Sequence, residues 1–117
     1  MKPIPVEFSW TGKRALKRIL KSRKLRNPEA EQFLTPNCPT DAQGILIPES
    51  ISFHIAWYPK GTRDAEWLFT FQDFQISVSP QCTRLLEGKK LKLKPKSEIT
   101  FVSDPPITAE DFDAAYN

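Results

Sequence analysis

The sequence has few of the residues from which catalytic and metal sites are built. Its 117 residues include one histidine, His54, two cysteines, Cys38 and Cys82, and four glycines. A single histidine excludes His-rich metal sites and most catalytic triads, and so few glycines leave little backbone that can approach a nucleotide closely. Neither cysteine has the near neighbour that C-x-x-C chemistry requires. We therefore expect a protein that is not an enzyme, has no cofactor and keeps its thiols reduced in the cytoplasm.

Long hydrophobic runs are absent too. No apolar stretch approaches the length of a bilayer span, and the first residues have no apolar segment followed by a small-residue cleavage site. The hydrophobic fraction of 39% with 26% charged residues is typical of a folded chain, and the length suits one domain over residues 1–117. We expect no membrane span.

The hydrophobic pattern predicts a helix first and strands afterwards. Ser9 and Thr11 offer capping oxygens for a helix from about Gly12 to Leu25, whose apolar stripe is Ala15, Leu16, Ile19 and Leu20. The proline-rich stretch 27–44 predicts a surface loop insertion, with one helical turn at 29–33. Alternating residues then predict strands at 44–47, 51–58, 66–71, 74–79, 89–94 and 99–102.

Two short helices complete the pattern. The first has Ser79 as its N-cap, Pro80 at its first position and Gly88 as its stop, with Leu85 and Leu86 facing inward. The second spans 108–116 and is capped by Thr108. The aromatic residues expected in the core are Trp57, Trp67, Phe69, Phe71 and Phe74. The sequence thus predicts a small, mainly β domain of the α+β class, with an N-terminal helix packed on mixed sheets.

This order of elements resembles that of the HesB-like A-type iron-sulfur cluster carriers. The similarity lies in Ile51-Ser-Phe-His-Ile-Ala-Trp-Tyr-Pro, in Asp64 before an aromatic strand, in Phe74-Gln-Ile-Ser-Val-Ser, in Leu85-Leu-Glu-Gly-Lys-Lys-Leu and in the segment Phe101 to Pro106. The helix that follows Val6-Glu-Phe-Ser-Trp is also where the family has one. The resemblance implies the HesB-like fold.

The cysteine ligands of that family are missing. The resemblance places one family cysteine near Pro48-Glu49-Ser50 and a C-x-C pair within 108–117, and neither segment contains cysteine. Because cluster iron is held by thiolates, the fold is carried over without its metal ligands. An iron or iron-sulfur carrier with unconventional ligands stays open as an alternative, with Cys38 as the first residue to suspect. We expect Cys82 to be a buried structural residue and His54 to lie on the surface. We expect a solvated helix start at Glu110, Asp111 and Asp113.

The predicted N-terminal helix carries the strongest functional signal. Basic residues surround its apolar stripe on three sides: Lys13, Arg14, Lys17, Arg18, Lys21, Arg23, Lys24 and Arg26. Such a face suits an acidic protein surface or a subunit of a complex, or the phosphates of a nucleic acid, whereas a solvated face without a partner is the plain alternative. We expect an accessory or adaptor protein that docks through this helix. Nucleic-acid binding and a homodimer remain open.

Overall fold

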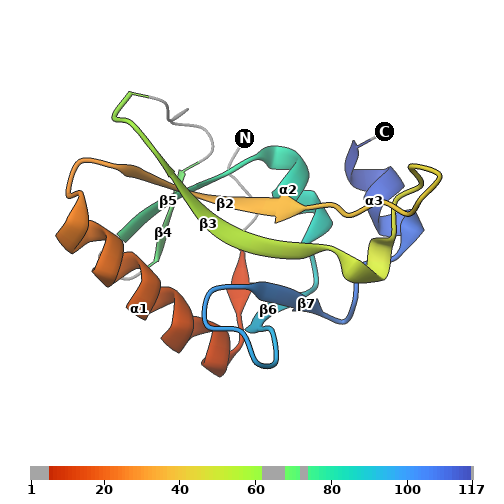
Figure 1. Cartoon of the computed structure of the whole chain (residues 1–117), viewed down its shortest axis with the longest axis horizontal. Coiled ribbons are helices and arrows are strands. Elements are labelled where there is room, and N and C mark those ends of the chain that lie inside the picture. Colours follow the sequence, from red (N-terminus) through yellow and green to blue (C-terminus); the bar gives the residue numbers. More distant parts are fainter. Residues whose placement is uncertain (1–5, 62–67, 72–73, 117) are drawn as a thin grey trace.

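The computed structural model describes residues 6–61, 68–71 and 74–116 and shows a small α+β domain (Figure 1). Its elements along the chain are β1 (Glu7–Phe8), α1 (Trp10–Arg26), β2 (Glu31–Asn37), a 3-10 turn η1 (Pro48–Ser50), β3 (Ser52–Tyr58), β4 (Leu68–Phe71), β5 (Phe74–Val78), α2 (Pro80–Leu85), β6 (Lys90–Leu93), β7 (Phe101–Asp104) and α3 (Ala109–Tyr116). The expected α+β class is confirmed.

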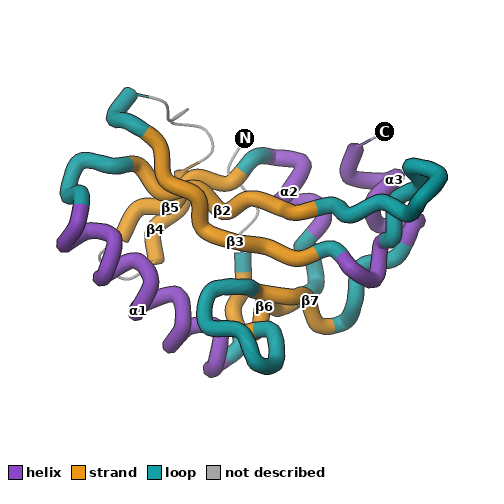
Figure 2. The backbone as a smooth tube through the Cα atoms, in the orientation of Figure 1, coloured by secondary structure: helices purple, strands orange, loops and turns teal. Residues whose placement is uncertain are grey.

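The strands form one curled, mixed sheet in the order β1-β6-β7-β3-β2-β5-β4. The pairs β1 with β6 and β2 with β5 are parallel, and the other neighbours are antiparallel. Figure 2 shows α1 running along one side of the sheet, whereas α2 and α3 lie together at the other end of the molecule. The helix α1 is therefore open to solvent along its outer length.

The core lies between α1 and the sheet. The α1 stripe of Ala15, Leu16, Ile19 and Leu20 is buried as its spacing predicts. It belongs to one cluster with the fully buried side chains of Phe53 on β3, Ile76 on β5, Leu85 on α2, and Leu91 and Phe101 on β6 and β7. Burial of this apolar surface is the main force that holds the helix on the sheet.

The first turn of α1 lies directly on β6. The Ser9 side chain caps the helix by accepting a hydrogen bond from the Gly12 amide at 3.1 Å. The Ser9 amide donates to the Leu91 carbonyl oxygen at 2.8 Å, and a Cβ placed on Gly12 would lie 2.3 Å from that same oxygen. Because no side chain fits in that distance, glycine is required at position 12 for the helix to approach the strand.

The structure corrects the prediction for residues 28–44. This stretch was expected to be a loop with a helical turn, but it contains β2, which pairs with β3 along its whole length and with β5 on its other side. The sequence did not predict this strand, because Pro36 interrupts the alternating pattern. The strand expected at 44–47 is only an isolated bridge between Thr40 and Leu46. The loop between β2 and β3 thus covers 38–51.

The predicted aromatic core is also corrected. Trp57 shares a strand face with the buried Phe53 and Ile55, yet it is 49% exposed, next to the last residue of β3. Phe74 is half-buried and packs against the edge of the core. Asp64, Trp67 and the side chains of Phe69 and Phe71 lie outside the described residues. Aliphatic residues, with Phe53 and Phe101, fill the centre instead.

Candidate protein-docking surface

The outer face of α1 is basic along its whole length. Eight of its 17 residues are lysine or arginine, and the helix contains no acidic residue. All eight lie outside the buried stripe. Seven of them are exposed, namely Lys13, Arg14, Lys17, Arg18, Lys21, Lys24 and Arg26. Because the stripe must face the sheet, the helical repeat places the basic positions of α1 toward solvent or along its margins.

Arg23 differs from the other seven. Its side chain is half-buried, and its Nη1 atom donates a hydrogen bond to the carbonyl oxygen of Ile55 on β3. Desolvation by this burial, and then the nearby charge of Arg26, lower the pKa of the Arg23 guanidinium from its ordinary value. This residue fastens the last turns of α1 to the sheet, so of the eight predicted contact residues it is the least available to a partner.

Arg18 connects α1 to a second basic segment. Its Nη2 atom donates to the carbonyl oxygen of Glu98 at 2.6 Å, which holds the turn between β6 and β7 against the helix (Figure 1). That turn carries Lys94 and Lys96, both exposed. It is closed by bonds from the Lys94 amide to the Thr100 carbonyl oxygen at 2.8 Å and from the Ser97 amide to the Lys94 carbonyl oxygen at 3.0 Å.

The exposed cations of α1, together with Lys94 and Lys96, are called the "basic surface" below. None of these residues forms an ion pair with another described residue. A salt bridge elsewhere joins Lys89 to Asp111 at 3.1 Å. The sequence predicts a strand at 89–94 and does not connect the lysines around it with the N-terminal helix. The hydrogen bond that brings their turn to α1 spans 80 positions, and no local pattern signals it.

The two thiols lie on a different part of the molecule. Cys38 follows β2 and is half-buried, whereas Cys82 is fully buried in α2, and both are free. Burial raises the pKa of the Cys38 thiol, and burial followed by the charge of Cys38 raises the pKa of Cys82 to about 12. Such thiols carry little thiolate, the form that binds metals. Within the described residues no three His, Cys, Asp or Glu side chains gather as a metal-binding group.

The other polar residues singled out from the sequence have structural partners. His54 is exposed on β3, where its Nε2 atom lies 2.9 Å from the Thr35 hydroxyl. Asp111 accepts a hydrogen bond from the Thr108 amide at 3.0 Å, and the Asp111 amide donates to the Thr108 hydroxyl at 3.1 Å. This reciprocal pair caps α3 as predicted for Thr108. These groups are not gathered into one site.

Two further findings bear on function. Among the described helices, none combines the length and the apolar character needed to cross a bilayer. Comparison of the chain with family models, with curated proteins and with solved structures gave no significant match. What the chain does must therefore be argued from its own surface.

Proposed function

Since no relative supplies a function, we propose from the basic surface that the chain is a non-enzymatic adaptor that docks on an acidic surface of a protein complex. The proposal includes a HesB-like fold that has lost its cluster ligands. The order of the elements supports the fold, and the lack of cysteine in the segments where that family has it supports the loss. The two free thiols are in keeping with a cytoplasmic setting.

The observation that carries the proposal is the set of unpaired cations on α1. Lys13, Lys17 and Lys21 follow one another at a spacing of four residues, and Arg14 and Arg18 repeat that spacing beside them. Each like-charge pair at this spacing destabilises a helix by roughly 0.2–0.5 kcal/mol. The repulsion between these like charges does not itself stabilise the folded chain. An acidic partner would turn the repulsion into attraction.

A protein partner fits this surface better than a nucleic acid does. Proteins that hold single strands place aromatic side chains among their basic residues, so that bases stack on them. The aromatic residue of α1 is Trp10 at its first position, and the guanidinium of Arg14 already lies 4.8 Å from the centroid of its ring. The rest of α1 offers charge without an aromatic side chain.

The test is capture of a complex by the tagged chain, with charge-matched variants. Lys17→Glu lies in the middle of the basic surface, and Lys60→Glu makes the same change of charge at an exposed residue after β3. We expect the wild-type chain and Lys60→Glu to retain a protein complex that nuclease does not release and that salt does release. Lys17→Glu should not retain it. Retention by Lys17→Glu, or release by nuclease, would contradict the proposal.

A further inference from the structure

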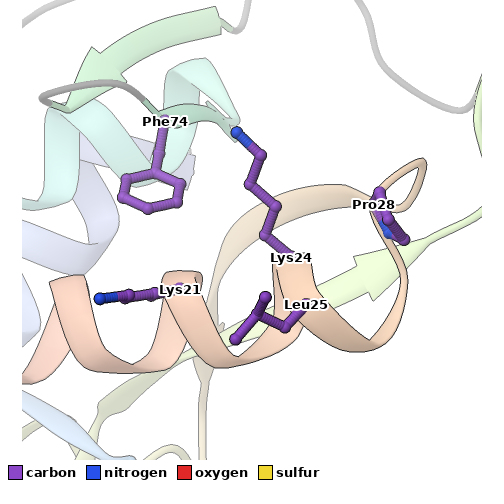
Figure 3. A pocket seen from close by; sticks show the side chains of 5 residues that line it. All are labelled: Lys21, Lys24, Leu25, Pro28 and Phe74. Carbon is purple, nitrogen blue, oxygen red and sulfur yellow. The ribbon is translucent and has the colours of Figure 1, made fainter.

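A small apolar cavity lies at the C-terminal end of the basic surface. Its volume is about 300 Å³, and it is lined by Lys21, Lys24, Leu25, Pro28 and Phe74. Figure 3 shows Phe74 across the hollow from the side chains that α1 contributes, with Pro28 at the turn that follows the helix. All five residues belong to the described part of the chain. The cavity therefore joins two segments that are almost 50 positions apart in the sequence.

The walls of the cavity are apolar and one of them is unusually open to water. Leu25 is 79% exposed, although it is a large aliphatic residue in the last turns of α1. Phe74 is half-buried, so part of its ring is also accessible. Covering such surface is favourable by roughly 25 cal/mol per Å². The cavity is therefore a place where an apolar side chain from outside gains free energy.

The rim of the cavity is positively charged. The Nζ atom of Lys24 lies 5.7 Å from the centroid of the Phe74 ring, and Lys21 stands one helical turn earlier. Among the described residues that line the cavity there is no carboxylate. A ligand that places an apolar group in the hollow must therefore place its neighbouring groups beside two ammonium ions. Negative charge next to the apolar group is what complements this arrangement.

We propose that the Leu25–Phe74 cavity is the anchor site for one bulky apolar side chain of an acidic peptide segment, whose carboxylates pair with Lys21, Lys24 and the neighbouring cations of α1. This inference rests on the proposed docking function and specifies the partner: a segment with a single aromatic or aliphatic residue among glutamates or aspartates. The cavity is at the lower end of the volumes of ligand pockets, which range over roughly 300–1,000 Å³, and so it accommodates one side chain better than a large ligand. Binding energy at interfaces is concentrated in such anchors, and charge supplies the orientation.

The test uses two labelled synthetic peptides and fluorescence anisotropy. One peptide has a phenylalanine in the middle of a run of glutamates, and the other has serine in its place. We expect the wild-type chain to bind the phenylalanine peptide roughly tenfold more tightly, since part of one aromatic side chain is buried. Salt should weaken both peptides, because both use the same cations.

Three variants locate the effect. Leu25→Ser removes the exposed wall, and we expect it to bind the two peptides equally while keeping the salt dependence. Leu25→Met restores an apolar wall and should restore the preference. Ile45→Ser changes a residue that is 64% exposed and lies outside the cavity lining, so it should keep the full preference. Circular dichroism checks that each variant is folded.

The outcomes separate this inference from the docking proposal. Equal binding of both peptides by the wild-type chain, with salt dependence intact, would overturn the anchor site alone. Binding of neither peptide, or binding that Lys17→Glu leaves unchanged, would overturn the docking function on which the inference rests. If decanoate binds more tightly than the phenylalanine peptide and Leu25→Ser abolishes that binding, the occupant is a small amphiphile and not a peptide.

Discussion

Arg18 of α1 and Glu98 of the β6–β7 turn are joined by a hydrogen bond from a guanidinium nitrogen to a backbone carbonyl oxygen, 2.6 Å long. The bond uses the main chain of Glu98, so the contact depends on the fold of the turn. It is made by a residue that also belongs to the basic surface. Arg18 thus has two roles, because it shapes the surface and adds to its charge.

Removal of this guanidinium should loosen the turn. We expect Arg18→Ala to lower the free energy of unfolding by about 1 kcal/mol, since an exposed, charge-assisted hydrogen bond is lost. The matched variant Lys17→Ala removes an exposed cation next to it and should change stability by much less. Urea unfolding gives the two values. Hydrogen exchange at the amides of Lys94 and Ser97 should accelerate in Arg18→Ala alone, and equal exchange in both variants would contradict a holding role.

The cap of α3 should make stability depend on acid pH. The hydrogen bond from the Thr108 amide is the main cause that lowers the pKa of Asp111 below its ordinary value. Burial acts in the opposite direction, and the contacts with Lys89 and the Thr108 hydroxyl lower the pKa further. The cap therefore stabilises the fold at neutral pH and is lost as the pH falls through the folded-state pKa of Asp111. We expect Asp111→Asn to cost at most about 1 kcal/mol at neutral pH, because it removes the charge that pairs with Lys89 and strengthens the hydrogen bond from the Thr108 amide.

This difference should vanish in acid, where the wild-type carboxyl is protonated too. Glu110→Gln removes a charge from the same helical turn and should have a smaller effect. Urea unfolding over a range of acidic pH compares the three proteins. A cost of Asp111→Asn that stays constant at every pH would show that the carboxylate charge is unimportant.

The thiols should differ in reactivity according to their burial. Cys38 is half-buried with a raised pKa, so we expect slow modification by a maleimide in the native protein at neutral pH. Cys82 is fully buried with a pKa of about 12, and it should react only after unfolding in urea. Mass spectrometry counts the modified sites. Native Cys38→Ser should therefore show no labelling, and rapid labelling of this variant would contradict the observed burial of Cys82.

Tyr116 should titrate late and should destabilise the fold in alkali. Desolvation, and then the charges of Cys82 and Cys38, raise the pKa of Tyr116 to about 12 from an ordinary value of 10.0. The unfolded chain loses this proton first, so the free energy of unfolding falls as the pH rises from about 10 toward 12. The tyrosinate absorbance of the wild-type chain minus that of Tyr116→Phe gives the titration. A titration near the ordinary value of 10.0 would contradict the desolvation of this hydroxyl.

Local signals in the sequence predicted the parts of the fold that depend on neighbours along the chain. The cap at Ser79 with Pro80 after it, the cap at Thr108 and the buried stripe of α1 are confirmed, because each arises within a few residues. The strand β2 was missed, since its support comes from β3 and β5 on either side and its own residues do not alternate. Propensity is overridden where partners distant in sequence supply the hydrogen bonds.

The candidate site was predicted in the same uneven way. The basic face of α1 follows from helical spacing and was predicted residue by residue. The inward turn of Arg23, the approach of the 94–98 turn and the cavity between Leu25 and Phe74 were not predicted. Each depends on how α1 is placed on the sheet, which is a property of the packed molecule and not of the helix sequence.

The contact of Gly12 with the Leu91 carbonyl oxygen fixes that placement, and it has a consequence for selectivity. Because α1 is held against β6 at this point, its cations keep fixed spacings along the helix axis. Positions four residues apart are separated by roughly 6 Å along the axis, at about 1.5 Å per residue. Only the side chains of the cations, and not the helix, must lose freedom when a partner binds. In the docking that we propose, acidic residues of the partner would have to match this spacing.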